Sequence, residues 1–220
     1  MKRTKKAVVL LSGGLDSATA LYVVKAAGYK TYCLSFDYGQ RHCKELRQAR
    51  RIARASDSPW SMVRFRMPWK GSALLDRAQA LPSQTTNRVI PSTYVPARNI
   101  IFLSFAAAYA EVIPAEAIVI GANEIDYSGY PDCRKEFLTA FQTALQRGTK
   151  RGVEGRAVAI LAPLVRKSKL QIIKTAVRLR VPLELTWSCY RGGKSPCGRC
   201  DSCRLRREGF RKAQLTDPAL

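Results

Sequence analysis

The stretch Ala7-Val8-Val9-Leu10-Leu11-Ser12-Gly13-Gly14-Leu15-Asp16-Ser17 decides the fold. Its five leading apolar residues predict a strand that is buried on both faces of a parallel sheet. Residues 18–24 continue as a predicted helix, so the glycine pair precedes a helix N-terminus. There the free backbone N–H groups and the helix dipole attract an anion, and the glycines let a phosphate approach closely. The stretch therefore predicts a strand, a phosphate loop and a helix.

The rest of the chain predicts an α/β fold, an open parallel sheet flanked by helices. Apolar runs indicate further strands at residues 31–36, 60–65, 117–121 and 158–161. Helical spacing of apolar residues indicates helices at 43–55, 100–111, 134–146 and 168–179, with a short helix at 72–77 inside a loop from 68 to 91. We expect a nucleotide-binding domain at residues 1–185 and a separate C-terminal module at 186–220.

The chain has 220 residues, of which 46% are hydrophobic and 9% are aromatic. This is the composition of a globular protein with a sizeable core. No apolar run approaches the roughly 20 residues that cross a bilayer. The basic N-terminal residues precede an apolar run too short for a signal peptide. We therefore expect a cytoplasmic protein without a membrane partner.

Positive charge dominates the chain, which has 38 Lys and Arg against 16 Asp and Glu and a formal net charge of +22. Such a charge attracts polyanions, which makes nucleic acid a candidate partner. The basic residues are scattered and no recognised nucleic-acid module accompanies them, which favours a solvated basic surface. The charge permits nucleic-acid binding without requiring it.

Polar segments follow several predicted strands, at the edge where open parallel sheets bind ligands. Residues 36–42 leave the second strand and contain the only histidine, for which a surface or capping role is the alternative. Arg98 and Asn99 begin a predicted helix, where they could hold an anion, form a salt bridge or cap the helix. The polar and aromatic segment 122–133 follows another strand and is a candidate substrate wall.

Cysteines near the end of the chain predict a metal site. The chain has seven cysteines, an odd number that argues against a complete disulfide framework. Four thiolates with two C-x2-C steps satisfy a closed, structural zinc site, while free thiols and an iron–sulfur cluster are the alternatives. Nearby arginines, Arg206 among them, would favour the thiolate forms. The predicted ligands are Cys189, Cys197, Cys200 and Cys203.

Several motifs together resemble a known family. The sequence Ser12-Gly13-Gly14-Leu15-Asp16-Ser17 resembles the SGGxDS loop of the ATP pyrophosphatases. With FDYGQRH at 36–42, YVPARN at 94–99, GANEIDYSGYPDC at 121–133, TWSCY at 186–190 and PCGRCDSC at 196–203, the chain resembles the 7-cyano-7-deazaguanine synthases of queuosine biosynthesis. The resemblance implies a Rossmann-like adenine nucleotide hydrolase fold, a homodimer, bound zinc, and conversion of 7-carboxy-7-deazaguanine and ammonia into the nitrile at the expense of ATP.

The resemblance also implies residue roles. Asp16 would bind magnesium at the phosphates, a role that suits a carboxylate. Lys169 would neutralise charge in the transition state, with a plain surface lysine as the alternative, and Arg98 would meet the substrate carboxylate. The implied nucleotide contacts are Leu11, Ser12, Gly13, Gly14, Leu15, Asp16, Ser17, Ala18, Thr19, Ala20, Leu21, Phe36, Gln40, Arg41 and His42. The implied substrate contacts are Arg98, Asn99, Glu124, Asp126, Tyr127, Tyr130 and Asp132.

Two rival hypotheses follow from the basic charge. One is a zinc-containing RNA-binding module, in which the basic surface is the function and the phosphate loop is vestigial. The other is an enzyme with the same loop that adenylates a base within intact tRNA. An incubation with the free base, ammonium, ATP and magnesium separates both rivals from the synthase.

Overall fold

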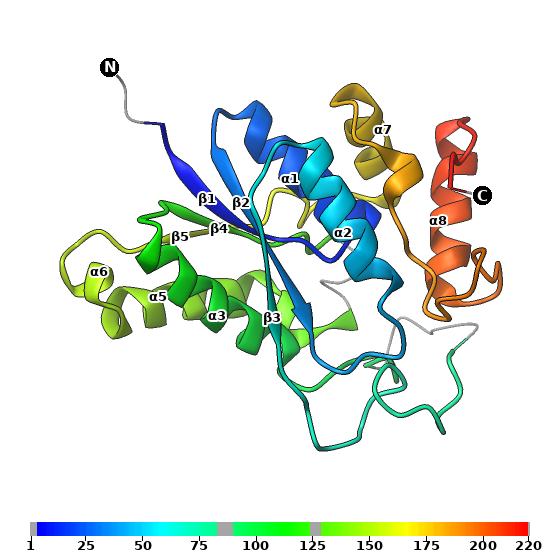
Figure 1. Ribbon diagram of the computed structural model, residues 1–220, viewed down its shortest axis with the longest axis horizontal. Helices are drawn as coiled ribbons and strands as arrows, with labels where there is room; N and C mark the ends of the chain where they lie inside the picture. Colours follow the sequence, from blue (N-terminus) through cyan, green and yellow to red (C-terminus); the bar gives the residue numbers. More distant parts are fainter. Residues whose placement is uncertain (1–3, 83–89, 124–128, 220) are drawn as a thin grey trace.

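The computed structural model describes residues 4–82, 90–123 and 129–219. Within these residues the chain forms a five-stranded parallel sheet with the strand order β3-β2-β1-β4-β5, which confirms the predicted fold class (Figure 1). The strands are β1 Lys6–Leu10, β2 Lys30–Asp37, β3 Trp60–Arg64, β4 Ala117–Val119 and β5 Ala159–Leu161.

The opening apolar run lies at the centre of this sheet. Strand β1 pairs with β2 on one side and with β4 on the other, so that Val8 lies beside both Tyr32 and Ile118. Successive side chains of a strand point to opposite faces. Val9 accordingly belongs to the core on one face and Val8 to the core on the other, and both are fully buried. A run without polar residues is what a strand covered on both faces requires.

Helices cover both faces of the sheet. The core on one face is built from α1, α2, α7 and α8, and the core on the other face from α3 and α5 (Figure 1). The helices are α1 Leu15–Ala26, α2 Lys44–Ala55, α3 Arg98–Val112, α5 Lys135–Gly148, α6 Lys150–Val153, α7 Lys169–Arg178 and α8 Asp201–Ala213. Two short 3-10 helices, Pro131–Cys133 and Leu183–Leu185, complete the described elements.

Two predictions of elements were wrong or incomplete. Residues 72–77 form turns instead of the short helix that we predicted. Helix α8 was not predicted, because its residues are mostly polar and the apolar Phe210 stands near its end. Burial of Phe210 in the same core as α1 and α7 now explains why the segment is helical.

The strand order reverses direction between β1 and β4. From β1 the chain moves to β2 and β3 on one side of the sheet, whereas β4 and β5 lie on the other side. Ligands of open parallel sheets bind beyond the carboxyl ends of the strands at such a switch point. The segments that follow β1, β2 and β4 are therefore the ones expected to form a site.

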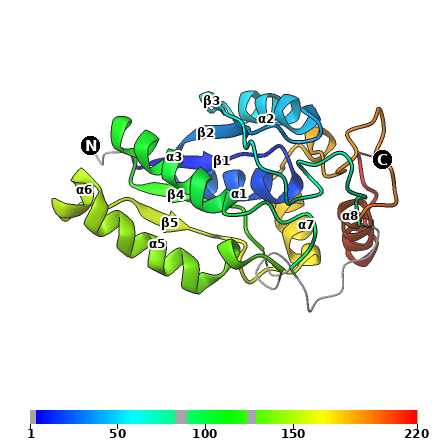
Figure 2. The ribbon, with the colours of Figure 1, turned by 90° about the horizontal axis from the view of Figure 1, so that it is seen from below.

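The C-terminal segment lies at the end of the molecule opposite α6 (Figure 2). Helix α8 packs against α7, and Phe210 is only 3% exposed within the main core. The division of the chain at residue 185 stays a prediction. Among the helices that the structure describes, none is both long enough and apolar enough to span a membrane.

Candidate active site and metal centre

The phosphate loop is shaped by its own serines. The Ser17 hydroxyl donates to the Gly14 carbonyl over 3.1 Å and accepts from the Ser12 amide over 3.2 Å. The two hydroxyls lie 3.0 Å apart. Helix α1 begins at Leu15, directly after the loop, and its first amide groups face the loop as a helix N-terminus does. These bonds hold the loop open for an anion.

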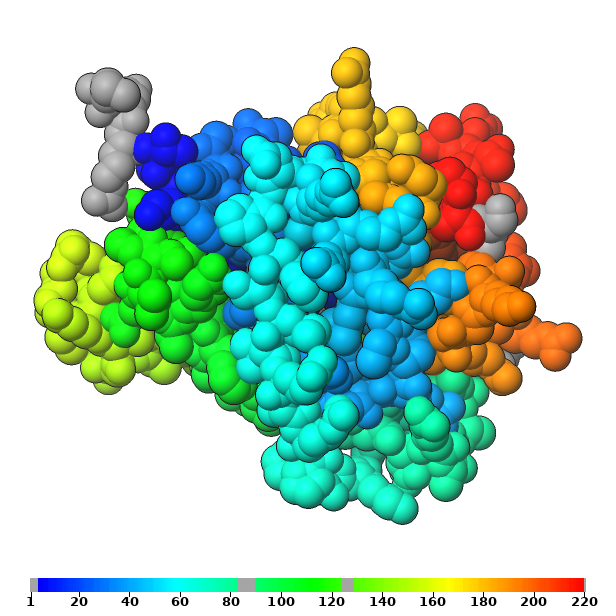
Figure 3. All heavy atoms as spheres, viewed as in Figure 1, coloured from blue at the N-terminus to red at the C-terminus, as the bar shows by residue number. Residues whose placement is uncertain are grey.

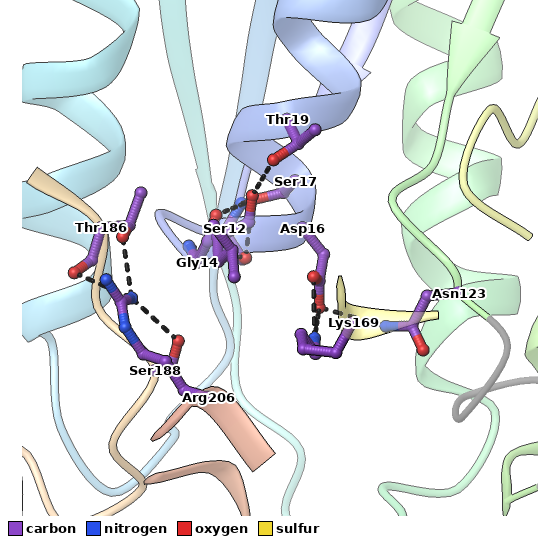
Figure 4. Close-up of polar contacts among 11 residues, drawn as sticks. Ser12, Gly14, Asp16, Ser17, Thr19, Asn123, Lys169, Thr186, Ser188 and Arg206 are labelled. Carbon is purple, nitrogen blue, oxygen red and sulfur yellow. Dashed lines mark hydrogen bonds and ion pairs between the residues drawn. The ribbon is translucent and has the colours of Figure 1, made fainter. Parts of the chain in front are cut away.

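Asp16 and Lys169, both predicted to be catalytic, form an ion pair. The Lys169 Nζ donates to the Asp16 carboxylate over 2.8 Å and 2.7 Å. The Asn123 side chain, which follows β4, donates to the same carboxylate over 3.1 Å (Figure 4). Lys169 is the first residue of α7, whose N-cap Ser168 forms a capping box with Gln171. The sequence thus brings together three polar groups from α1, α7 and the end of β4.

A cavity of about 290 Å³ opens beside the loop. Its wall is built from the ends of β1, β2 and β4 and from the first turns of α1, α2 and α3. Of the residues that the sequence predicted for nucleotide and substrate, the wall includes Leu11, Ser12, Gly14, Leu15, Asp16, Ser17, Phe36, Gln40, Arg41, His42, Arg98, Asn99 and Tyr130. Residues from four separate motifs therefore meet at one place.

Other predicted contacts lie away from this cavity. Asp132 is buried and accepts from the Asn99 backbone amide over 2.9 Å, so it caps the start of α3. The predicted residues Glu124, Asp126 and Tyr127 lie outside the described residues. The wall also does not include Gly13, Ala18, Thr19, Ala20 or Leu21. All of these except Gly13 are fully buried, because α1 turns their side chains away from the cavity.

Arg98 is held in a fixed position at the start of α3. Ala97 before it adopts a left-handed conformation with φ of 57°, which is uncommon for a residue with a Cβ. The Arg98 guanidinium donates to the Tyr38 hydroxyl over 3.2 Å. Burial acts to lower the pKa of Arg98, but interactions with Tyr38, Tyr130 and Cys133 outweigh it and raise the pKa. A permanently charged guanidinium therefore lines the cavity.

His42 and Arg41 line the cavity and also contact neighbouring segments of the chain. Burial lowers the pKa of His42, while a hydrogen bond to the Cys189 backbone opposes that change. The His42 Nδ1 is buried without a partner in the described part of the chain, as is the Arg41 Nε. Arg41 donates through its Nη2 to the carbonyls of Asp76 and Gln79. The His42 Nδ1 is thus an unused polar atom on the cavity wall.

The four predicted cysteines converge. Their sulfur atoms all lie within 4.8 Å of one another, and Cys197 and Cys203 are 4.0 Å apart. A tetrahedral zinc site with bonds of about 2.3 Å places its sulfurs roughly 3.8 Å apart. Backbone amides also donate to these sulfurs, including those of Arg191 and Cys197 to Cys189 over 3.4 Å and 3.3 Å. The geometry and the donors fit thiolates that surround one metal ion.

Arg206, one of the arginines expected to favour the thiolate forms, is held by partners of its own. Its guanidinium forms a buried ion pair with Asp217, at 2.6 Å and 2.8 Å. It also donates to the Thr186 hydroxyl over 2.8 Å, and its contacts with Thr186 and Ser188 are visible in Figure 4. Its guanidinium therefore helps to order the segment that leads into Cys189.

That segment connects the metal site to the phosphate loop. The Trp187 amide donates to the Gly13 carbonyl over 2.9 Å. The Lys44 ammonium lies 3.6 Å from the Trp187 ring centroid and donates to the carbonyls of Gly193 and Lys194 over 2.8 Å and 2.6 Å. Figure 3 shows this C-terminal segment, in orange, directly beside the start of α2. The metal site thus forms one continuous wall with the phosphate loop.

Comparison with known proteins identifies the family. The family model described as queuosine biosynthesis protein QueC matches residues 6–214. The chain belongs to the QueC family. A 7-cyano-7-deazaguanine synthase from Trichodesmium erythraeum is 52% identical over 98% of this chain and 100% of its own length. One from Acetivibrio thermocellus is 54% identical over 97% of this chain and 96% of its own length. QueC relatives are enzymes, and so is this chain.

Solved structures confirm the fold. NMN synthetase from Francisella tularensis has a TM-score of 0.52 at 16% identity and covers 97% of this chain and 78% of its own. A U34-tRNA thiolase from Methanococcus maripaludis has a TM-score of 0.51 at 16% identity and covers 97% of this chain and 66% of its own. At such low identity the likeness concerns the fold of this QueC chain alone.

Among the residues that sequence reasoning did not assign to the site are Glu45, which lines the cavity, and Asn123, which supports it. Glu45 in the first turn of α2 lines the cavity, although it stands in a strongly basic helix. Asn123 donates to Asp16, and its position directly after a buried strand was the available signal. For Glu45 the signal was its place three residues after His42, at the start of the helix that follows the polar segment 36–42.

Proposed function

We propose that this chain is an ATP-dependent ligase that makes 7-cyano-7-deazaguanine from 7-carboxy-7-deazaguanine and ammonia; its relatives are named for synthesis of that product. The observation that carries the proposal is that the phosphate loop and the Arg98 guanidinium line the same cavity. A site that adenylates a carboxylate needs both an anion-binding loop for the phosphates and a cation for the carboxylate.

In the first round the loop binds the ATP phosphates and Arg98 holds the substrate carboxylate. A carboxylate oxygen attacks the α-phosphorus and pyrophosphate leaves. Lys169, at 2.7 Å from Asp16, is close enough to the loop to neutralise charge that develops during this step. Ammonia then displaces AMP to form an amide. In the second round the amide oxygen is adenylated in the same way, and loss of AMP gives the nitrile.

Asp16 is the residue that would hold magnesium, because it is a carboxylate at the phosphate loop. Magnesium would supply further neutralisation of the phosphate charge. The four cysteines would hold zinc in a closed set of ligands, so that the metal supports folding and takes no part in chemistry. We also propose that the enzyme is a homodimer, which static light scattering tests by giving the mass of two chains.

The test is an incubation of the purified protein with 7-carboxy-7-deazaguanine, ammonium chloride, ATP and magnesium, analysed by mass spectrometry. We expect the nitrile, with pyrophosphate and about two AMP for each nitrile, since each adenylation consumes one ATP. The same incubation without ammonium is the control and should give no nitrile. ADP and phosphate as the products, or conversion of a base only within intact tRNA, would contradict the proposal.

A further inference from the structure

Glu45 is a carboxyl group in the cavity that the steps above do not use. It lies in the first turn of α2 and lines the same cavity as the phosphate loop and Arg98. In the described part of the chain its carboxylate has neither a hydrogen bond nor an ion pair within 4.0 Å, whereas Asp16 is paired with Lys169. Glu45 is therefore free to interact with a bound molecule.

The backbone of α2 fixes where this carboxyl group lies. Gly13 has a φ of +89°, and a Cβ there would lie 2.2 Å from the Glu45 carbonyl oxygen. Only glycine permits this approach, which brings the first turn of α2 directly against the phosphate loop. On its other side Glu45 is near enough to Arg98 for the charge of Arg98 to act on it. Glu45 thus belongs to the wall that joins the loop to Arg98.

The reacting carbon must come to this part of the wall if the proposed function is correct. In an acyl adenylate the carbon is joined to the α-phosphorus through a single oxygen atom. The loop would hold the phosphate and Arg98 the carboxylate, so the carbon lies between groups that both neighbour Glu45. Ammonia must reach that same carbon to form the C–N bond.

We propose that Glu45 is the general base for the nitrogen chemistry of both rounds. In the first round its carboxylate takes a proton from ammonium, which frees the nitrogen lone pair. That pair forms the C–N bond, the C–O bond to AMP breaks with its electrons on AMP, and the nitrogen loses its extra proton to solvent. In the second round the adenylated amide first loses one of its two N–H protons to solvent, and the carboxylate takes the remaining one. The N–H electrons then become the third C–N bond as AMP leaves.

The environment of Glu45 suits this role. Burial raises its pKa to about 7, against the opposing charge of Arg98. A base is most effective when its pKa lies near the working pH. On other elements Arg98 is the charged group that acts on Glu45, and Arg98 in turn donates to the Tyr38 hydroxyl, which also lines the cavity. The remaining titratable groups of the cavity wall are Asp16, Arg41, His42, Tyr130, Cys133 and Tyr190.

The deciding experiment compares two nucleophiles in Glu45→Gln, with the exposed Glu184→Gln as the matched control. Ammonium needs a base before it can attack, whereas hydroxylamine is neutral at pH 7.5 and traps an acyl adenylate directly as a hydroxamate. We expect amide and nitrile formation to fall about 10²-fold or more, the usual contribution of a general base. Hydroxamate and pyrophosphate formation should stay within about threefold of wild type.

A second readout is the pH profile of kcat/KM for ammonium. In the wild type the rise of log(kcat/KM) with pH should change slope near pH 7, and this change should be absent from Glu45→Gln. An equal loss of hydroxamate and amide would overturn the assignment, because it would mean that Glu45 binds the substrate. Unchanged nitrile formation would overturn it as well.

Melting temperatures confirm that the variants fold. If wild-type protein makes neither hydroxamate nor nitrile, the proposed function itself fails, which is a different result from a defect confined to Glu45→Gln.

Discussion

The oxygen atoms of Asp16 that we propose to bind magnesium are already hydrogen-bonded within the protein. Lys169 donates to both of its carboxylate oxygens, and Asn123 donates to one of them. A magnesium ion that binds there must share or replace the lysine contact. Lys169 and magnesium would both depend on the negative charge of the carboxylate, whereas Asn123 requires only an acceptor oxygen at that position.

We predict that Asp16→Asn folds normally and loses activity by about 10²-fold or more, because the amide keeps the size of the side chain and removes its charge. Pyrophosphate release at limiting magnesium is the measurement. Asp57→Asn, at an exposed turn, is the control and should behave as wild type. Wild-type turnover in Asp16→Asn would show that the residue does not hold magnesium.

Glu45 also gives a prediction about stability and pH. Its pKa is about 7 in the folded protein, above the ordinary glutamate value of 4.5, so folding disfavours its charged form. Below about pH 4.5 the Glu45 carboxyl group is protonated in both the folded and the unfolded state, so it does not lower the free energy of unfolding. As the pH rises toward 7, Glu45 ionises first in the unfolded state, and the free energy of unfolding falls. Above about pH 7 this loss of stability reaches its full size.

Glu45→Gln should therefore melt at a higher temperature than wild type at pH 8 and at nearly the same temperature at pH 4.5. The expected gain is roughly 1–3 kcal/mol, or several degrees in a chain of this size. Thermal melting at the two pH values measures it. A variant that is less stable than wild type at pH 8 would show that the carboxylate is well accommodated.

The sequence could predict the polar residues at strand ends but not this carboxyl group. Ser12, His42 and Arg98 follow or precede clear apolar runs, and the structure brings all three to one cavity. Glu45 stands among lysines and arginines, where a solvated helix face is the ordinary interpretation. Its burial depends on the contact between α2 and Gly13, two segments about thirty residues apart, and no local pattern encodes it.

At the scale of elements, the spacing of apolar residues predicted all five strands and most of the helices that pack on the sheet. The five strands fall within two residues of the predicted ranges at each end, because buried strands need uninterrupted apolar runs. Helix α8 escaped prediction because it is anchored by few apolar side chains, together with the ion pair between Arg206 and Asp217. This ion pair depends on Asp217, which lies outside the helix, so the pattern of the helix itself does not indicate it.

The metal site gives the prediction at this scale. Cys189→Ser and Cys200→Ser should each lose zinc and melt at a temperature lower by several degrees, since binding free energy at a structural site is also folding free energy. Metal analysis for zinc and iron, together with thermal melting, measures both effects. Cys43→Ser, at an exposed position, is the control and should keep its metal. Full zinc occupancy in either ligand variant would exclude that cysteine as a ligand.

For the molecule as a whole, the net charge of +22 sets the response to salt. If the basic surface is only solvated, raising sodium chloride from 50 to 200 mM should change turnover on the free base by less than about twofold. Contacts with several phosphates of a nucleic acid would instead lower binding by orders of magnitude over that range. Filter binding of tRNA at both salt concentrations completes the test, and tight binding at 200 mM would support the RNA-modifying rival.

Trp187 is placed to serve as an intrinsic fluorescence probe of the site. Its indole lines the cavity, lies beneath the Lys44 ammonium, and is 5% exposed, while its backbone is bonded to the phosphate loop two residues before Cys189. Indole emission responds to nearby charge and to water, so both ATP binding and zinc removal should change it. With Trp60 and Trp69 replaced by phenylalanine, one fluorophore would follow both events. After a chelator is added, stopped-flow fluorescence could then show whether the nucleotide dissociates before or after the metal is removed.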